Sequence, residues 1–356
     1  MYEMKKGVSA DIERIPNYEG NKSSSSFGVL PLSLPLNLGL QSQSEVASTR
    51  FWAVLIGIDG YPYYPLHGCV SDAKLMEKYL IEDLSVPKNR IQLLLGASGG
   101  EVNLDLDAVS SPTRANILRT LYSLIDNPEI TPGDNIIIYF AGHGSRYAAK
   151  EYYRGRTPPG VSLASIRPIE ALCPVDRTPF DSTGSPIPDI SDREINAIFT
   201  QLSLTKGHRI TLILDCCYSG VHTKSSPGGR TRSAYRTVPP LPRASIGPML
   251  EGANQALMAF PEYSARCSVA APDWQPDTGS HVVLAACQEY QFAQEEVEED
   301  RGFHGVFTSA LVQAFQSGQL KRGSMYVDII RALPQWPHQI PVVAGDHKEG
   351  PIWYQE

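Results

Sequence analysis

Short apolar runs, each ending in glycine or a polar residue, alternate along the chain with segments of helical periodicity. Short apolar runs of this kind are typical of strands that are buried on both faces. Five runs show this pattern: residues 51–60, 90–96, 134–144, 209–220 and 280–288. Four segments show apolar spacings of three and four, as in helices: 71–84, 111–126, 192–202 and 304–318. Strands alternating with helices predict βαβ units and an α/β fold with a mostly parallel sheet.

Local signals predict where two of the helices begin. Ser71 or Asp72 is placed to cap the helix over 71–84. Pro112 stands at a first-turn position of the helix over 111–126, where its missing N–H has no cost.

Two segments follow neither period. Residues 1–48 combine a serine run with proline and leucine repeats, which predicts a largely disordered N-terminal tail. Residues 221–277 are dominated in their first half by Pro, Gly, Ser and Arg, which predicts a long mobile loop. We therefore expect one folded region over 49–356, interrupted by this loop.

Composition excludes several classes of protein. The 356 residues carry a formal net charge of −7, which opposes nucleic acid or an anionic membrane as the main partner. The six cysteines include no Cys-x-x-Cys pair, which favours reduced thiols inside a cell. The N-terminus lacks the apolar core of a signal peptide, and no apolar run approaches the ~18 residues of a membrane span. We expect a soluble cytoplasmic protein, with the nucleus as the alternative.

Candidate chemistry lies where two of the strands end. Ligands bind outside the carboxyl ends of strands in open α/β sheets. The run over 134–144 ends with His143, and the run over 209–220 ends with Asp215, Cys216 and Cys217. A cysteine nucleophile needs a base, usually histidine, and nearby glycines offer backbone N–H groups for an oxyanion hole. A lone histidine or a buried cysteine pair is more often structural, but their joint placement favours catalysis.

The same residues resemble a known family. The stretches "YFAGHG" and "LILDCCYSG" are similar to the two catalytic signatures of metacaspases, which belong to the caspase-like cysteine peptidases. Further similar stretches occur in the family's order over about residues 50–320: "AVLIGID", "LHGCVSDAKLMEKYL", "SPTRANILRTL", "EALCPVD" and "VVLAACQEYQFAQE". The resemblance implies a caspase-like three-layer αβα sandwich. It also implies a large segment (about 50–220), a cleavable linker (about 221–277) and a small segment (about 278–356).

The resemblance also implies the catalytic roles. His143 matches the catalytic histidine and Cys217 the nucleophile, while Cys216 falls on a variable position and is interpreted as a supporting thiol. The backbone N–H groups of Gly144 and Cys217 are the implied oxyanion donors. Peptide hydrolysis would pass through a thioester acyl-enzyme, without a required cofactor.

The pocket for the residue before the cut is implied to be acidic. Asp215 and Asp72 match its two carboxylates, with Cys69 alongside, and this favours Arg or Lys in the substrate. Helix capping is an equally good explanation of Asp72. Ala141 stands where the family usually has serine, which removes a hydroxyl from the pocket.

The linker is basic. No acidic residue lies between Asp215 and Glu251, and the same stretch offers these candidate self-cleavage sites: Lys224, Arg230, Arg232, Arg236 and Arg243. A mobile loop can also be basic by chance. The leading hypothesis is an endopeptidase acting after Arg or Lys on proteins or peptides, and a monomer. The alternative is a catalytically idle caspase-like scaffold.

Calcium activation, known in the family, is poorly supported by the residues. Asp192 matches one position of the aspartate cluster, but Ile169, Ser191 and Lys224 occupy others. A hard cation needs several oxygens, so we expect weak or absent calcium dependence. The acidic run 295–300 is interpreted as a solvated loop.

Overall fold

The computed structural model describes residues 50–97, 108–178, 187–218, 235–260, 268–288, 291–298 and 302–354. All of them belong to one compact unit, which spans Ser42–Glu356. The tail predicted over 1–48 and most of the basic first half of the linker lie outside these ranges. Among the described helices, none combines the length and the hydrophobicity that a bilayer span requires.

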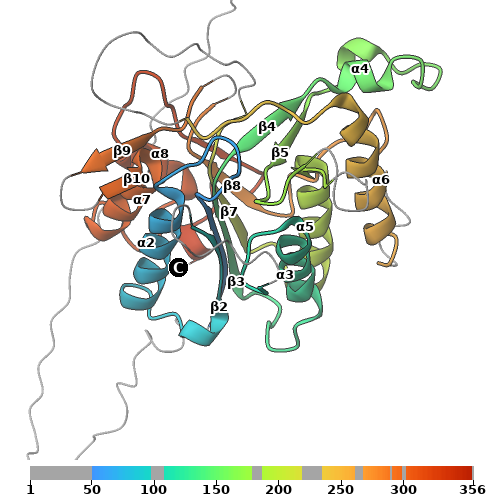
Figure 1. The fold of residues 1–356 in the computed structure, drawn as a ribbon. Helices are drawn as coiled ribbons and strands as arrows, with labels where there is room; N and C mark the ends of the chain where they lie inside the picture. Colours follow the sequence, from blue (N-terminus) through green and yellow to red (C-terminus); the bar gives the residue numbers. More distant parts are fainter. Residues whose placement is uncertain are drawn as a thin grey trace, which may run out of the picture. The chain divides into compact units, whose positions relative to one another are not determined.

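A six-stranded sheet forms the centre of this unit, in the order β11-β8-β7-β3-β1-β2 (Figure 1). Its strands are β1 (Phe51–Ile58), β2 (Ile91–Gly96), β3 (Asn135–Ala141), β7 (Ile210–Asp215), β8 (Val282–Ala285) and β11 (Val342–Ala344). Neighbouring strands pair in parallel except at β11, which is antiparallel to β8. The five predicted strands and the mostly parallel sheet are confirmed.

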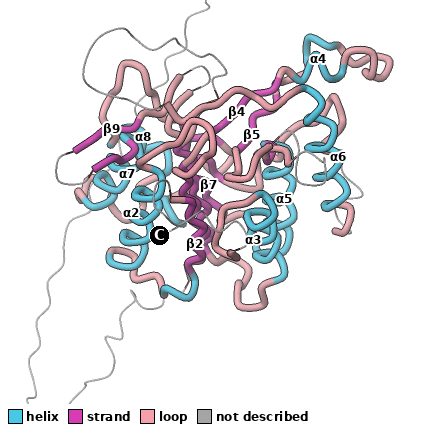
Figure 2. Tube along the Cα trace, viewed as in Figure 1, coloured by secondary structure: helices cyan, strands magenta, loops and turns pink. Residues whose placement is uncertain are grey.

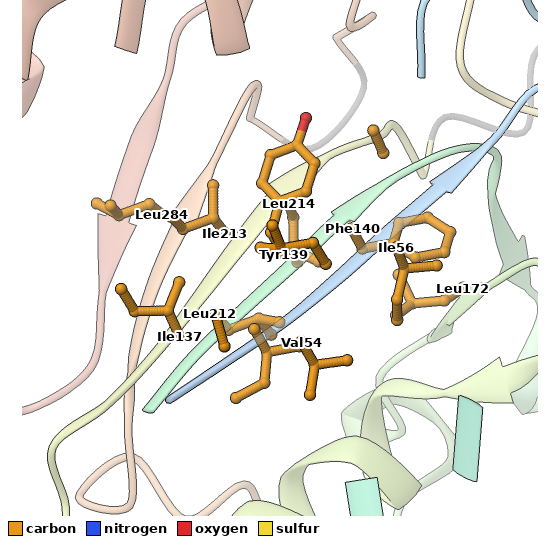
Figure 3. Close-up of a cluster of buried hydrophobic side chains, with 14 of the residues drawn as sticks. Val54, Ile56, Ile137, Tyr139, Phe140, Leu172, Leu212, Ile213, Leu214 and Leu284 are labelled. Carbon is orange, nitrogen blue, oxygen red and sulfur yellow. The ribbon is translucent and has the colours of Figure 1, made fainter. Parts of the chain in front are cut away.

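The three central strands β1, β3 and β7 are buried at every position, as their largely apolar sequences predict. Side chains from neighbouring strands pack together along the sheet (Figure 3), among them Val54, Ile137, Ile213 and Leu284. Because successive residues of a strand point to opposite faces, each of these strands supplies both faces of the core. Removal of this apolar surface from water is the main stabilising contribution at the centre of the fold.

Helices cover both faces of the sheet (Figures 1 and 2), which confirms the three-layer αβα prediction. Helices α2 (Cys69–Glu82), α7 (Val306–Gln316) and α8 (Tyr326–Ala332) lie on one side. Helices α3 (Arg114–Asp126), α5 (Asp192–Lys206) and α6 (Ile246–Leu257) lie on the other. The remaining helical pieces are short: α4 (Ala149–Tyr153), η1 (Lys88–Arg90), η2 (Leu163–Ser165), η3 (Arg243–Ser245) and η4 (Ile352–Tyr354).

Two small antiparallel sheets complete the unit, and the sequence pattern did not predict them. One contains β4 (Gly144–Tyr147), β5 (Ile169–Leu172) and β6 (Ile190–Ser191). The other is the hairpin of β9 (Glu295–Glu298) and β10 (Gly302–Gly305). Strand β4 follows His143 directly, so the turn after β3 continues into ordered structure.

Both predicted helix starts are wrong. Helix α2 begins at Cys69, and its N-cap residue, Gly68, has no capping side chain. The Ser71 hydroxyl instead donates to the Gly68 carbonyl at 2.8 Å. Helix α3 begins after Thr113, whose side chain accepts the N–H of Asn116 and so caps the helix. Pro112 therefore precedes the cap rather than occupying the first turn.

Two loop predictions also need correction. The linker is not a continuous loop, because α6 lies inside it and buries Ile246, Met249 and Leu250. The acidic run is not a solvated loop at its start, because Glu295 is buried in the first position of β9. In both cases the buried residues make tertiary contacts that the local sequence does not reveal.

Candidate active site

The ends of β3 and β7 bring the predicted catalytic residues to one edge of the sheet. Ala141 and Asp215 are paired in register, and His143 and Cys217 each follow two residues later. Both side chains are buried. A Cβ on Gly144 would lie 2.3 Å from the Cys217 carbonyl oxygen, so the close approach of the two backbones requires glycine at this position.

His143 is held by the loop that follows β1. Its Nε2 lies 2.6 Å from the Tyr64 carbonyl oxygen, and its backbone N–H donates to the Tyr61 hydroxyl at 3.0 Å. The Tyr61 ring lies 4.5 Å from the imidazole, centroid to centroid. Since a carbonyl can only accept, this contact assigns the proton to Nε2 and leaves Nδ1 as the basic nitrogen.

The free nitrogen of His143 is buried and chemically available. Nδ1 has no hydrogen-bond partner among the described residues. Burial lowers the pKa of His143 to about 3, which keeps the imidazole neutral. Tyr64, which orients the ring, has a left-handed backbone with φ of 61°. Such a conformation costs energy in a bulky residue and recurs at functional sites.

Cys217 presents its sulfur to the loop after β8. The Ala293 N–H donates to Cys217 Sγ at 2.5 Å. Burial, followed by the nearby Cys287 thiol, raises the pKa of Cys217 well above its ordinary value, so the group is a thiol here. Cys216 is also buried, and its carbonyl oxygen lies 3.7 Å from Cys287 Sγ. Its supporting role stays a prediction.

Three carboxylates converge on one arginine side chain. Asp72, Asp215 and Glu295 surround the guanidinium of Arg236, which comes from the linker and has 0% exposure. Arg236 Nη2 lies 2.5 Å from Asp72 Oδ2, and Nη1 lies 2.9 Å from Asp215 Oδ2. Glu295 Oε1 lies 3.3 Å from Nη2. This acidic pocket, defined by the three carboxylates, is complementary to one planar cation.

The carboxylates are themselves held in place by the protein. The Gly305 N–H donates to Asp72, and the Thr308 hydroxyl donates to Asp215 at 2.6 Å. Burial raises the pKa of Asp72 to about 7, with the Arg236 charge opposing the shift and Asp215 adding to it. Since the Asp72 carboxylate binds Gly305 N–H and Arg236, it does not cap helix α2. The structure places it in the pocket alongside Asp215.

The backbone of Arg236 lies across the edge of the sheet as an extended peptide. Its carbonyl oxygen accepts the N–H groups of Gly144 and Cys217, each at 3.1 Å. Its own N–H donates to the Ala293 carbonyl at 3.3 Å, and Val238 N–H donates to the Gly144 carbonyl at 3.1 Å. The two N–H groups expected to form an oxyanion hole thus converge on a single peptide carbonyl.

Two further residues of the pocket, Glu295 and Gly305, are not predicted by the sequence pattern. Glu295 accepts the N–H groups of His67 and Gly68, so its carboxylate is fixed against the start of α2. Gly305 leaves the space that the charges occupy, since a Cβ there would lie 2.5 Å from Asp215 Oδ2. An acidic run and a glycine before a helix carry no local signal for either role.

The other predicted pocket residues lie nearby. Cys69 Sγ is 3.6 Å from Glu295 Oε1, and Ala141 is buried beside Asp215 in the sheet. Among the candidate cleavage residues, Arg243 is exposed at η3. Lys224, Arg230 and Arg232 lie outside the described residues.

The described residues at the positions compared with the family's calcium cluster have other contacts in the structure. Ser191 caps α5 by accepting the Glu194 N–H, and Ile169 lies in an apolar cluster. Asp192 accepts the Arg193 N–H, and burial raises its pKa to about 6. Lys224 lies outside the described residues. Weak or absent calcium dependence stays a prediction.

Asp59, Cys69 and Glu295 also place potential ligand atoms within 4.8 Å of one another. The Asp59 carboxylate already accepts the N–H groups of Cys69 and Val70. The arrangement of these groups is therefore explained by the way they support the start of α2.

The chain is similar in sequence to known proteins over part of its length. Residues 52–225 match the sequence model of the metacaspase peptidase C14 domain. Metacaspase-1 of Arabidopsis thaliana is 31% identical over 169 residues, which are 47% of this chain and 39% of that protein. Metacaspase-1A of Aspergillus oryzae is 31% identical over 213 residues, which are 57% of this chain and 44% of that protein. The matches thus span less than half the length of these curated relatives.

A solved structure supports the fold alone. The crystal structure of a protein from Geobacter sulfurreducens superposes with a TM-score of 0.50 at 18% identity. The match covers 86% of this chain and 97% of that chain.

Proposed function

Since residues 52–225 carry a metacaspase-type peptidase C14 domain, we propose that the chain is a cysteine endopeptidase that cuts after arginine. The proposal extends to lysine, the other long basic side chain, and to self-processing after Arg236. The observation that carries it is the position of Arg236. Its side chain occupies the acidic pocket while its carbonyl oxygen accepts the N–H groups of Gly144 and Cys217. A substrate arginine would need both sets of contacts.

The chemistry follows from the protonation states of the two catalytic residues. His143 Nδ1 takes the proton of the Cys217 thiol, and Sγ attacks the carbonyl carbon of the arginine. The oxygen becomes negatively charged and is stabilised by the Gly144 and Cys217 N–H groups. His143 then returns the proton to the leaving amine, which is that of Thr237 in self-processing. Water hydrolyses the resulting thioester and regenerates the thiol.

The acidic pocket supports basic specificity over the cleavage after aspartate that is typical of caspases. A substrate aspartate would place a fourth carboxylate among Asp72, Asp215 and Glu295 in a buried site, where like charges repel strongly. Arginine adds a planar donor that bonds two carboxylates at once. Lysine offers one compact charge, so we expect weaker hydrolysis after lysine.

The experiment uses the purified full chain and matched peptide reporters ending in Arg, Lys or Asp, with and without calcium. Intact mass and N-terminal sequencing of the products would locate any self-cleavage. We expect hydrolysis in the order Arg, then Lys, with none after Asp, and a new N-terminus at Thr237.

Variants separate the roles of neighbouring residues. Cys217→Ala should abolish hydrolysis, while Cys216→Ala serves as the matched thiol control and should retain it. Arg236→Ala should remove the cut before Thr237, and Arg243→Ala should leave it. Activity in Cys217→Ala or a preference for Asp would overturn the proposal. A folded chain that cuts no reporter would favour the scaffold alternative.

A further inference from the structure

The linker segment contacts the protein on both sides of Arg236, and these contacts go beyond the acidic pocket. On the basis of the proposed function, we infer that the site also recognises an aromatic residue directly before the arginine and a small aliphatic residue two positions after it. Tyr235 and Val238 occupy these positions in the chain's own linker.

The position before the arginine is formed by the loop after β8. Tyr235 pairs with Gln294 in an antiparallel bridge, next to the hydrogen bond from Arg236 N–H to the Ala293 carbonyl. In such a pair, the residue two positions from the direct partner lies on the same face and within reach of an aromatic side chain. That residue is Phe292, whose ring centroid lies 4.7 Å from that of Tyr235 at 48° between the planes.

This contact is suited to recognition of a separate peptide. Tyr235 is 40% exposed, so one face of the ring packs against Phe292 while part of the side chain remains in water. An aromatic pair in this geometry contributes beyond the area that it buries. Other aromatic residues can make the same contact, whereas alanine cannot.

The position two residues after the cut is enclosed. Val238 is 3% exposed and belongs to the main apolar core cluster. Its N–H donates to the Gly144 carbonyl at 3.1 Å, which fixes the backbone at the edge of the sheet beside the catalytic residues. A charged side chain at this position would have to be desolvated without a partner. Thr237, which lies between, is half-buried.

The test uses quenched fluorescent peptides cut by the full chain carrying Tyr235→Ala, Arg236→Ala and Val238→Ala, so that the linker competes neither for the pocket nor for the two flanking positions. The parent peptide contains Tyr-Arg-Thr-Val, and two others replace Tyr by Ala or Val by Asp. We expect the Tyr-to-Ala change to lower kcat/KM by roughly three- to tenfold. The Val-to-Asp change should lower it by more than about tenfold.

An enzyme variant tests whether Phe292 reads the aromatic residue. In Phe292→Ala, the ratio of kcat/KM for the Tyr and Ala peptides should fall to about one, because the partner ring is absent. This ratio does not depend on the folded fraction of the sample. Phe260→Ala is the matched control, since Phe260 stacks on Tyr122 and not on the linker; its ratio should equal that of the parent enzyme.

The outcomes separate this inference from the proposed function. If all arginine peptides are cut at equal rates, the recognition of flanking residues is overturned while cleavage after arginine stands. An unchanged ratio in Phe292→Ala overturns the assignment of Phe292. If no arginine peptide is cut, the proposed function fails, and this inference fails with it.

Discussion

Arg236 illustrates how strongly one buried charge constrains a site. Its guanidinium has 0% exposure and is bonded to Asp72, Asp215 and Glu295. Leaving such a charge without a partner costs about 3–5 kcal/mol, and the same holds for buried carboxylates without a cation. The pocket and the arginine therefore stabilise each other. A pocket of this kind is selective because a neutral or acidic side chain would leave the carboxylates unpaired.

Gly305 provides the first residue-level prediction. A Cβ at this position would lie 2.5 Å from Asp215 Oδ2, 2.6 Å from Asp72 Oδ2 and 2.7 Å from Arg236 Nη1. Gly305→Ala should therefore displace the ion pairs and lower both self-processing and hydrolysis of arginine peptides by about 100-fold, which corresponds to the loss of about 3 kcal/mol. The measurement is kcat/KM together with the fraction of cleaved chain over time.

Gly252→Ala is the matched control for this prediction. Gly252 lies in α6 with nothing within 4 Å of an added Cβ, so alanine should leave activity unchanged and stabilise the helix slightly. Normal processing in Gly305→Ala would show that the space beside the carboxylates is not needed.

The pKa of Asp72 gives a prediction about pH. With Arg236 in the pocket the pKa is raised to about 7, and the guanidinium opposes the shift, so the fraction of carboxylate increases as the pH rises through 7 in the occupied pocket and at a higher pH in an empty one. Arginine binds the carboxylate form, and Asp215, Glu295 and the bound guanidinium are the charged groups that face it. The KM for an arginine peptide should fall by roughly three- to tenfold between pH 6 and pH 8.

Steady-state kinetics of the cleaved enzyme across this range would test the prediction. Asp72→Asn should raise the KM and remove the step near neutral pH, because the amide does not ionise. His143 contributes no step in this range while its pKa stays near 3. A flat KM profile in the parent enzyme would contradict the assignment to Asp72.

At the scale of elements, the strands and helices that a local sequence pattern determines could be predicted. Strands β1, β3 and β7 are apolar on both faces, so their existence and their parallel arrangement were predictable. The small sheets were not, because their strands have two to four residues and no clear period. Their pairing depends on residues far apart in the chain.

Some residues of the candidate site could likewise be predicted from local patterns, and others could not. His143 and Cys217 follow predicted strands, so their shared edge could be deduced from the βαβ order. Glu295 could not, because its burial depends on the N–H groups of His67 and Gly68, more than 200 positions away in the chain. Arg236 was one of several basic linker residues, and only tertiary structure distinguishes it from Arg243.

An ion pair between α3 and α5 leads to a prediction about stability. Arg114 Nη2 lies 2.8 Å from Glu194 Oε2, and the Glu194 side chain is 1% exposed. Burial raises the pKa of Glu194 to about 7, while Arg114 opposes the shift. Arg114→Met should destabilise the fold by about 2–4 kcal/mol at pH 7.5, since it leaves a buried carboxylate without its cation.

The loss should be smaller at pH 5.5. A carboxyl group with a raised pKa stabilises the folded state most at low pH, and this contribution is lost as the pH rises through about 7. Urea unfolding at the two pH values would measure the difference. Arg119→Met is the matched control, because Arg119 lies exposed on the same helix and should change stability little at either pH. Equal losses for both variants would contradict the role of the ion pair.

On the scale of the whole molecule, the acidic pocket is assembled from both sides of the linker. Asp72 and Asp215 precede the linker, while Glu295 and Gly305 follow it. Strand β7 before the linker pairs with β8 after it in the same sheet. A cut after Arg236 would thus leave both fragments in one hydrogen-bonded sheet with a shared core. We expect the cleaved chain to migrate as two bands under denaturing conditions while eluting as one particle of unchanged size in gel filtration.

Arg236 also links the state of the linker to activity on other substrates. A tethered segment acts at an effective concentration in the millimolar range or above, so an uncut linker should outcompete dilute peptides for the pocket. The uncut parent chain should therefore hydrolyse an arginine peptide only after a lag, and the lag should end as the fraction cut after Arg236 rises.

Arg236→Ala should vacate the pocket and abolish the lag even though its chain stays uncut at this position. Progress curves sampled in parallel on denaturing gels would measure both quantities, with Arg243→Ala as the control that keeps the lag. A lag of equal length in Arg236→Ala would show that the bound arginine does not restrain the enzyme.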